Sequence, residues 1–225
     1  MKLGVLFSGG KDSVFAAWMA VQKGYELGCL ISVISENPDS YMYHPVNINV
    51  INKQAEVMDV PLLVKKSKGK KELELIDLKR AIDEAKKKYD IEGVCVGAIS
   101  SNYQFERVKK ICRELSVGVF SPMWGWSEGE YMHQMIKNKF KVVVVKVAAD
   151  GLDENWLGKV IDEKAVEELG RKRIHIAGEG GEYESVVLEC PLFKRGLKIM
   201  KDEKKMDSEF SGNLIIKKIG LTGKG

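Results

Sequence analysis

The stretch Ser8-Gly9-Gly10-Lys11-Asp12-Ser13 follows directly after the apolar run at 3–7, LGVLF. This order of residues predicts a short buried strand, a glycine turn and a helix that begins near Asp12. The backbone N–H groups of such a turn, and of the first helical turn, have no partners within the helix, and the helix dipole adds positive potential there. The junction therefore predicts an anion site of the kind that binds phosphate.

The side chains of this hexapeptide fit the same interpretation. Gly9 and Gly10 allow a phosphate to approach the backbone closely, Lys11 supplies a mobile positive charge, and the two flanking serines carry hydroxyl donors. Asp12 is unexpected in a pure anion site, and an acid at this place suggests either a bound Mg²⁺ or a helix cap. The spacing is not that of the Walker P-loop, which places four residues between its first glycine and Gly-Lys-Ser/Thr.

The first half of the chain alternates short apolar runs with amphipathic stretches. We expect strands at 2–7, 26–34, 61–65, 93–98 and 118–120, and helices at 12–23, 46–58, 70–89 and 103–115. This alternation predicts an α/β fold, with a Rossmann-like parallel sheet that has helices on both faces. Ligands of such sheets bind at the carboxyl ends of the strands, so the hexapeptide, 32–37 and 100–102 are expected along one edge.

The rhythm changes after the segment at 121–126, SPMWGW. Ser127 and Glu130 form a capping box for a helix that reaches about Asn138. A strand at 140–149, a helix at 162–169 and strands at 185–189, 197–205 and 213–219 follow, the last two as a hairpin. We therefore expect a nucleotide-binding domain at 1–124 and a smaller α+β substrate-binding subdomain at 125–225. The apolar strands of the second subdomain would allow two chains to pair as a homodimer.

Composition limits the class of protein. The chain has 225 residues, a net charge of +4, 44% hydrophobic residues and 30% charged residues, as a globular protein does. It has no apolar run of bilayer length, and its first residues enter a strand at once, so we expect a cytoplasmic protein without a membrane partner. Its lysine runs favour solvated surfaces, with docking of an acidic macromolecule or RNA as the alternative. Nucleic acid is not an expected partner. Its four cysteines form no C-x-x-C pair, which favours small core residues over a zinc site or disulfides.

A second glycine-rich segment, at 178–184, reads GEGGEYE. Three carboxylates and three glycines in seven residues predict an exposed loop that binds a cation or orients an ammonium group, with an ordinary exposed turn as the alternative. The strand–helix connection at 97–107 carries Ser100 and Ser101, which either cap the helix or contact a ligand. Arg107, one turn later, is suited to a carboxylate, a phosphate or a surface ion pair.

The hexapeptide resembles the PP-loop of the N-type ATP pyrophosphatases. Over its whole length the chain resembles the diphthine–ammonia ligase family within that superfamily. The resemblance rests on the hexapeptide together with SYMYHPVN at 40–47, VGAISSNYQFERV at 96–108, PMWG at 122–125, GEGGEYES at 178–185 and VLECPLF at 187–193.

The resemblance implies an enzyme, a ligase that forms a C–N bond in the last step of diphthamide synthesis. ATP would activate the diphthine carboxylate of translation elongation factor two as an acyl-adenylate, with release of pyrophosphate. Free ammonium would then displace AMP, because the sequence shows no glutaminase domain. The implied cofactors are ATP and Mg²⁺.

Carried onto this chain, the resemblance assigns three groups of residues. The pyrophosphate and its metal would be held by Ser8, Gly9, Gly10, Lys11, Asp12 and Ser13, with Lys11, Asp12 and Ser13 catalytic and Asp12 at the metal. Adenine would meet backbone groups around Ser32 and Val33. The candidates for the diphthine and ammonia site are His44, Ser100, Ser101, Asn102, Gln104, Arg107, Trp124, Glu179, Gly180, Gly181, Glu182 and Glu184.

Two other functions remain alternatives on the sequence alone. One is a PP-loop enzyme that modifies tRNA, of the thiolase or lysidine-synthase type, although the cysteines are poorly arranged for a thiolase. The other is a non-catalytic ATP-binding protein on the same scaffold. Lys11 beside Asp12 favours catalysis over binding alone.

Overall fold

The computed structural model describes residues 1–35, 48–67, 71–99 and 102–223. These residues form two compact units, and each is described here by itself. The first unit comprises Met1–Ser8, Asp12–Ile48 and Asp59–Trp124, and the second comprises Gly9–Lys11, Asn49–Met58 and Gly125–Gly225.

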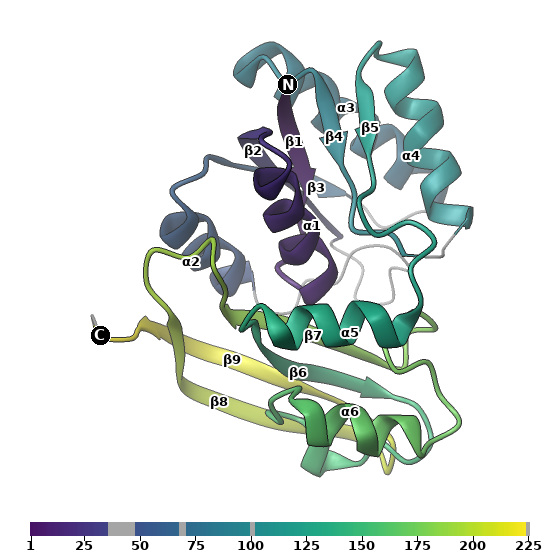
Figure 1. The fold of residues 1–225 in the computed structure, drawn as a ribbon, viewed down its shortest axis with the longest axis vertical. Coiled ribbons are helices and arrows are strands. Elements are labelled where there is room, and N and C mark those ends of the chain that lie inside the picture. Colours follow the sequence, from purple (N-terminus) through teal and green to yellow (C-terminus); the bar gives the residue numbers. More distant parts are fainter. Residues whose placement is uncertain (36–47, 68–70, 100–101, 224–225) are drawn as a thin grey trace. The chain divides into compact units, whose positions relative to one another are not determined.

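The first unit is built on a five-stranded sheet (Figure 1). Its strands are β1 (Lys2–Leu6), β2 (Glu26–Ser35), β3 (Leu62–Ser67), β4 (Gly93–Cys95) and β5 (Gly118–Phe120). They lie in the order β3-β2-β1-β4-β5, and all four strand pairs are parallel. The predicted parallel α/β sheet is therefore confirmed, and the carboxyl ends of its strands meet at one edge.

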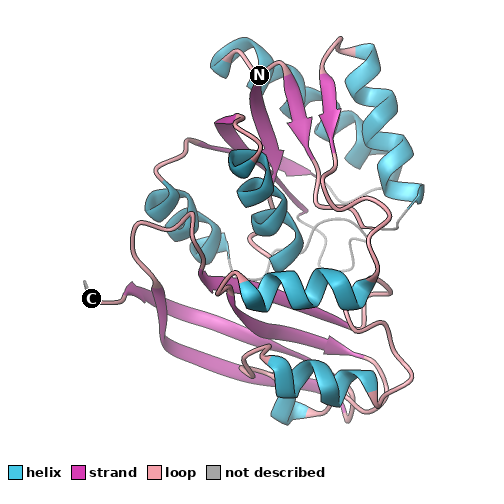
Figure 2. Ribbon diagram, in the orientation of Figure 1, coloured by secondary structure: helices cyan, strands magenta, loops and turns pink. Residues whose placement is uncertain are grey.

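Helices cover both faces of this sheet (Figures 1 and 2). They are α1 (Lys11–Gln22), α3 (Lys71–Tyr89) and α4 (Asn102–Glu114). A cluster of buried side chains joins α3 and α4 to one face, with Leu78 and Ile82 of α3 packed near Ile31 of β2 and Val94 of β4. Val14 and Phe15 of α1, which lies on the opposite face, are completely buried. Burial on both faces explains why the central strands are almost continuously apolar.

The second unit contains a four-stranded antiparallel sheet in the order β7-β6-β9-β8. Its strands are β6 (Lys141–Ala148), β7 (Tyr183–Glu189), β8 (Leu197–Ser208) and β9 (Ser211–Leu221), with β8 and β9 in the predicted hairpin. Its helices include α5 (Glu128–Lys137), α6 (Glu163–Gly170) and the short 3₁₀ helix η1 (Glu154–Trp156). The Ser127 side chain accepts a hydrogen bond from the Glu130 N–H at 3.2 Å, which confirms the predicted N-cap of α5.

Helix α2 (Ile48–Met58) belongs to the second unit except for its first residue. Asn49 Nδ2 donates to the carbonyl oxygen of Ile216 at 2.8 Å, and the Lys194 N–H donates to the Val57 carbonyl oxygen at 2.8 Å. The division drawn from the sequence, by contrast, placed α2 and Gly9–Lys11 with the first domain. Among the described helices, none is long and apolar enough to cross a membrane.

Candidate functional site

The hexapeptide joins β1 to α1, as the sequence predicts. Beyond the end of β1, the Phe7 N–H donates to the Ile31 carbonyl oxygen at 2.9 Å, which extends the parallel pairing by one residue. Gly9 then adopts φ +77°, a left-handed conformation that glycine reaches without strain, and α1 begins at Lys11. The result is a strand, a tight turn and a helix start within a few residues.

The two serines of the turn lie close to each other within the first unit. Ser13 Oγ accepts a hydrogen bond from the Ser8 N–H at 3.3 Å and lies 3.3 Å from Ser8 Oγ. Ser13 is buried, Asp12 is half-buried in the first turn of α1, and Ser8 is exposed. The Ser13 hydroxyl therefore ties the end of the strand to the start of the helix, and the Asp12 carboxylate lies at the positive end of the helix dipole.

The exit of β4 passes very close to this helix start. A Cβ atom at Gly97 would stand 2.7 Å from both the backbone carbon and oxygen of Asp12 and 2.9 Å from the Ser13 nitrogen. A side chain has no room there, because the obstructing atoms are backbone. Gly97 belongs to a motif that the sequence singled out, but its close packing against Asp12 was not anticipated.

Gly9 is held by residues of the second unit. Its carbonyl oxygen accepts hydrogen bonds from the Val187 N–H of β7 at 3.1 Å and from Gln54 Nε2 of α2 at 2.8 Å. Two residues along, the Lys11 N–H donates to Ser185 Oγ at 3.3 Å. Since β7 is an edge strand of its sheet, the glycine turn lies along that edge.

Lys11 is 3% exposed, which is unusual for a lysine. Its Nζ atom lies 5.4 Å from the ring centroid of Tyr183 and 5.8 Å from that of Tyr131. The Tyr183 hydroxyl in turn donates to the Ile176 carbonyl oxygen at 2.7 Å, which fixes the ring. Both rings lie within cation–π distance of the Nζ atom. Neither Tyr131 nor Tyr183 was among the predicted site residues.

Ser32 and Val33 lie near the carboxyl end of β2. The Ser32 hydroxyl is buried and donates to the carbonyl oxygen of Phe7. Backbone groups alternate along a strand, and Ile31 faces β1, so the N–H and C=O of Val33 also face the β1 side. The last pair in the register of β1 with β2 is Leu6 with Ile31. The backbone groups of Val33 therefore lie beyond the end of β1.

The acidic loop at 178–184 leads directly into β7, and its last two residues, Tyr183 and Glu184, are the first residues of that strand. Gly178 and Gly181 have φ values of +71° and +87°, which accounts for glycine at both turns. Glu182 Oε1 accepts a hydrogen bond from the His175 N–H at 3.1 Å, while its Oε2 atom is buried and has no hydrogen-bond partner. Glu184 forms an ion pair with Lys146 at 3.0 Å. Glu179 is half-buried, and Gly180 is exposed.

A hydrogen-bonded pair connects this loop region to the start of α5. His175 Nδ1 lies 2.5 Å from Glu128 Oε1, and Glu128 Oε2 accepts the Ala177 N–H at 3.2 Å. The hydrogen bond and the charge of Glu128 raise the pKa of His175, and the charges of Glu182 and Glu179 add to the effect. Partial burial alone would raise the pKa of Glu128, but its hydrogen bonds to His175 and Ala177 lower it. This pair was not among the predicted site residues.

Several predicted substrate residues lie in or near α4. Asn102 and Gln104 belong to its first turn, and Arg107 follows as a half-buried residue of the same helix. Trp124 is 37% exposed and stacks on Phe105, with the ring centroids 4.3 Å apart and the planes at 24°. His44, Ser100 and Ser101 lie outside the described residues.

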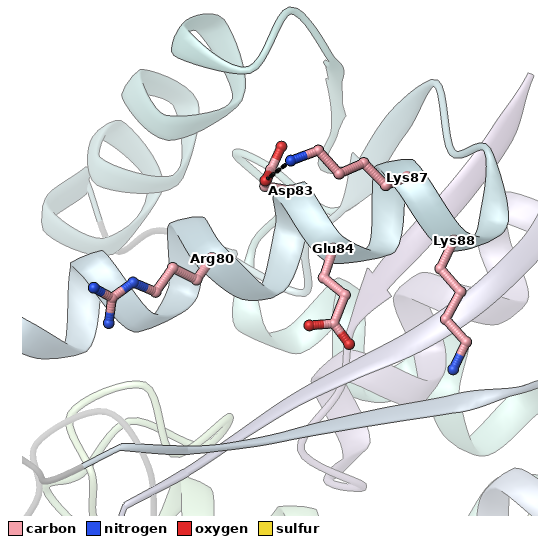
Figure 3. A pocket seen from close by; sticks show the side chains of 5 residues that line it. All are labelled: Arg80, Asp83, Glu84, Lys87 and Lys88. Carbon is pink, nitrogen blue, oxygen red and sulfur yellow. Dashed lines mark hydrogen bonds and ion pairs between the residues drawn. The ribbon is translucent and has the colours of Figure 1, made fainter.

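A pocket of about 470 Å³ lies elsewhere, along α3 (Figure 3). Lys87 Nζ forms an ion pair with Asp83 at 2.6 Å there, and Glu84 pairs with Lys65 of β3. The charges are mixed in sign and exposed, as on a solvated helix. The pocket includes none of the predicted site residues, and its lining is Arg80, Asp83, Glu84, Lys87 and Lys88.

All four cysteines are buried, as the sequence predicts for core residues. Burial raises the pKa of Cys29, Cys95, Cys112 and Cys190 to about 12 in each case. A nucleophilic cysteine requires a lowered pKa and access to its substrate. The thiols therefore lack the properties of a thiolase nucleophile.

The fold and the loop place the chain in the class of parallel α/β proteins with a glycine-rich strand–helix junction. Two family models match it: the diphthamide synthase N-terminal domain over residues 1–119 and the diphthamide synthase C-terminal domain over residues 127–221. The chain belongs to the diphthamide synthase family, which confirms the resemblance noted from its motifs.

Relatives match over most of the chain. A mouse protein named diphthine–ammonia ligase is 35% identical over 230 residues, covering 92% of this chain and 86% of that protein. The human protein of the same name is 34% identical, with 90% and 84% covered. The relative of that name from Schizosaccharomyces pombe is 34% identical over 97% of this chain, which spans only 39% of that longer protein.

Among solved structures, the chain is similar to a protein described as a predicted subunit of tRNA methyltransferase from Methanocaldococcus jannaschii. It has a TM-score of 0.41 and 13% sequence identity, and the match covers 85% of this chain and 98% of that one.

Proposed function

We propose that this protein is a diphthine–ammonia ligase that converts the diphthine carboxylate of translation elongation factor two into the amide of diphthamide. The observation that carries the proposal is the junction at 8–13, a strand–turn–helix with a positive-φ glycine and a buried lysine, in a chain that matches the family over both of its domains. Ligases of this name described in mouse and man match more than four fifths of their own length.

In the proposed reaction, an oxygen of the diphthine carboxylate attacks the α-phosphorus of ATP, and the bond from that phosphorus to the β-phosphate bridging oxygen breaks. Pyrophosphate leaves with this electron pair. Ammonia then attacks the acyl carbon, and AMP leaves with the carboxylate oxygen that had attacked the phosphorus. The nitrogen loses a proton to give the neutral amide. The first step requires stabilisation of a highly charged leaving group, and this is the chemistry that a helix start with glycine N–H groups and a lysine supplies.

The chain's own residues have separate tasks in this proposal. The N–H groups of Gly9 and Gly10 and the Lys11 charge hold the leaving pyrophosphate, and the hydroxyls of Ser8 and Ser13 donate to its oxygens. The two tyrosine rings beside Lys11 shield its Nζ atom from water, so that its attraction for phosphate is stronger than in water.

Asp12 would hold Mg²⁺. Its half-buried carboxylate stands in the first turn of α1, directly after the loop. Magnesium is commonly bound through one or two carboxylates together with substrate phosphates and water, so this donor fits the ion. When bound, the ion neutralises charge on the phosphates.

For adenine, the backbone N–H and C=O of Val33 are better placed than Ser32. The Ser32 hydroxyl is already used on the Phe7 carbonyl, whereas the Val33 groups face the side on which β1 has ended. A donor and an acceptor from one residue match the Watson–Crick edge of adenine.

The substrate and ammonium are assigned to the acidic loop and the α4 region. Glu182, with its buried and unpaired Oε2 atom, is the strongest candidate to accept a hydrogen bond from ammonium, and Glu179 and Glu184 add negative charge. His44, Ser100, Ser101, Asn102, Gln104, Arg107 and Trp124, with Gly180 and Gly181 of the acidic loop, remain candidates for contact with diphthine.

The test is an assay with the purified chain, ATP with Mg²⁺, ammonium chloride and elongation factor two carrying diphthine. Mass spectrometry of the modified histidine peptide reports amide, and AMP and pyrophosphate are quantified in the same sample. We expect one AMP for each amide, and a loss of at least about a hundred-fold in rate for Lys11→Ala. Lys23→Ala, at an exposed position just after α1, is the matched control and is expected to keep the rate.

Two results would contradict the proposal. Release of AMP without amide, together with tight and strongly salt-sensitive binding of tRNA, would favour the tRNA-modifying alternative. Binding of ATP without cleavage, under conditions in which the factor is present, would favour the non-catalytic protein. The buried thiols with pKa values of about 12 already disfavour a thiolase.

A further inference from the structure

We propose that Gln54 of α2 is a positioning residue of the phosphate-binding loop. Gln54 is completely buried, in contrast to most glutamines, and it lies in α2, which contains none of the predicted site residues. The inference rests on the proposed function in one respect, namely that the loop at 8–13 binds phosphate. It does not depend on which substrate is activated.

The side-chain amide of Gln54 makes two hydrogen bonds to backbone. Nε2 donates to the carbonyl oxygen of Gly9 at 2.8 Å and to the carbonyl oxygen of Val187 at 2.8 Å. Both acceptors are carbonyls, so the amide has only one sensible orientation, because a reversed amide would direct its own oxygen at two others. One side chain of α2 thus joins the loop to β7.

The oxygen of the same amide explains the glycine in the loop. A Cβ atom at Gly9 would stand 2.3 Å from Gln54 Oε1, which is well inside van der Waals contact. Oε1 is buried and makes no hydrogen bond, which is a costly state for an amide oxygen. Such an atom is retained where the position of the group has a use.

The use follows from the geometry of the peptide bond. In a trans peptide the C=O of Gly9 and the N–H of Gly10 lie in one plane and point in opposite directions. Gln54 Nε2 and the Val187 N–H both hold the Gly9 oxygen on the side of α2 and β7. The Gly10 N–H is therefore directed away from them. Gln54 fixes the direction in which this N–H is offered to an anion, without touching the anion itself.

The prediction separates phosphate binding from nucleoside binding. Calorimetry with pyrophosphate and with adenosine measures the two halves of ATP independently. For Gln54→Leu we expect pyrophosphate affinity to fall by at least about ten-fold, because two hydrogen bonds are lost, while adenosine affinity changes by less than about two-fold. Gln22→Leu, the same change at an exposed position at the end of α1, is the control and should alter neither affinity.

A second variant keeps the test independent of folding. In Gln54→Glu the side chain has nearly the same size, and only its protonated form has a donor, a single O–H that replaces one of the two hydrogen bonds to the carbonyls. We expect its pyrophosphate affinity, divided by that of the unmodified protein at the same pH, to recover as the pH falls. A residue that only fills space would show no such recovery.

The outcomes are distinguishable from those of the proposed function. Equal losses of pyrophosphate and adenosine affinity in Gln54→Leu, or a pH-independent ratio in Gln54→Glu, would overturn the role of Gln54. Absence of amide formation in the unmodified protein would overturn the ligase proposal and leave these binding measurements valid. Absence of pyrophosphate binding in the unmodified protein would overturn both.

Discussion

Lys11 holds a positive charge where lysines are seldom found, at 3% exposure between the rings of Tyr131 and Tyr183. Sequence reasoning identified this lysine from its place after two glycines. It could not identify the two tyrosines, which lie 120 and 172 positions further along the chain and come to Lys11 only through the fold. Local sequence pattern thus predicts the functional residues of the loop itself, but not the residues from distant parts of the chain that pack around them.

The close contact between Gly9 and Gln54 predicts the effect of Gly9→Ala. Both the positive φ and the collision with Oε1 oppose a side chain, so we expect the free energy of unfolding to fall by about 2 kcal/mol or more. Gly24→Ala is the matched control, because Gly24 has φ +79° but no atom within 4 Å of its Cβ position. It should lose only about 1 kcal/mol in urea denaturation. Equal losses of unfolding free energy in the two variants would show that the collision with Gln54 does not contribute to the cost of Gly9→Ala.

Gly97→Ala tests the packing of β4 against the start of α1. Its Cβ would meet backbone atoms of Asp12 and Ser13 at 2.7–2.9 Å, and backbone cannot move aside cheaply. We expect a loss of about 1–3 kcal/mol in stability and a weaker affinity for ATP in calorimetry. Gly129→Ala, in α5 with no atom within 4 Å, should be neutral or stabilising. Unchanged ATP affinity in Gly97→Ala would contradict a link between this contact and the loop.

At the scale of elements, local sequence patterns predict where strands and helices lie, but they do not predict how these elements pair and pack. The predicted strand at 118–120 agrees with β5, and the predicted helix at 70–89 agrees with α3 to within one residue. The order β3-β2-β1-β4-β5 was not predicted, because alternation of strands and helices leaves the order open. The sequence likewise does not show which surface covers α2, since an amphipathic pattern indicates that a helix has a buried face but not what packs against it.

The link between α5 and the loop before β7 predicts a dependence of stability on pH. The folded protein binds the His175 proton more tightly than the unfolded chain, because Glu128 raises the pKa of His175. The pair therefore stabilises the fold fully below the unfolded pKa of about 6.5, and this contribution is lost as the pH rises through the raised value. It amounts to at most about 1 kcal/mol, since the pair is largely exposed to solvent.

Urea denaturation across this pH range provides the measurement. The difference in unfolding free energy between the unmodified protein and His175→Gln should be largest near about pH 6 and should shrink above about pH 8. His133→Gln, at an exposed position of α5, is the control. A difference that grows with rising pH would mean that the pair is not held together by the His175 proton.

At the scale of the whole molecule, the boundary between the two compact units falls within the loop at 8–13. Ser8, Asp12 and Ser13 belong to the first unit and Gly9–Lys11 to the second, so the six residues of one motif are divided between two packing units. The two family models likewise cover both halves, over 1–119 and 127–221.

The four buried thiols offer a prediction for the intact protein. With pKa values raised to about 12, they should resist alkylation by iodoacetamide at neutral pH until the chain unfolds. Peptide mass spectrometry with and without urea measures this. Rapid modification of one cysteine in the folded protein would reveal a reactive thiol and would revive the thiolase alternative.

The central claim is that ATP is cleaved between its α- and β-phosphates by the substrate carboxylate. It is tested most directly with elongation factor two whose diphthine carboxylate carries ¹⁸O. The account predicts that one labelled oxygen appears in AMP for each amide formed, with unlabelled pyrophosphate. Label in inorganic phosphate with formation of ADP would instead mean activation at the γ-phosphate, and would contradict the role assigned to the loop at 8–13.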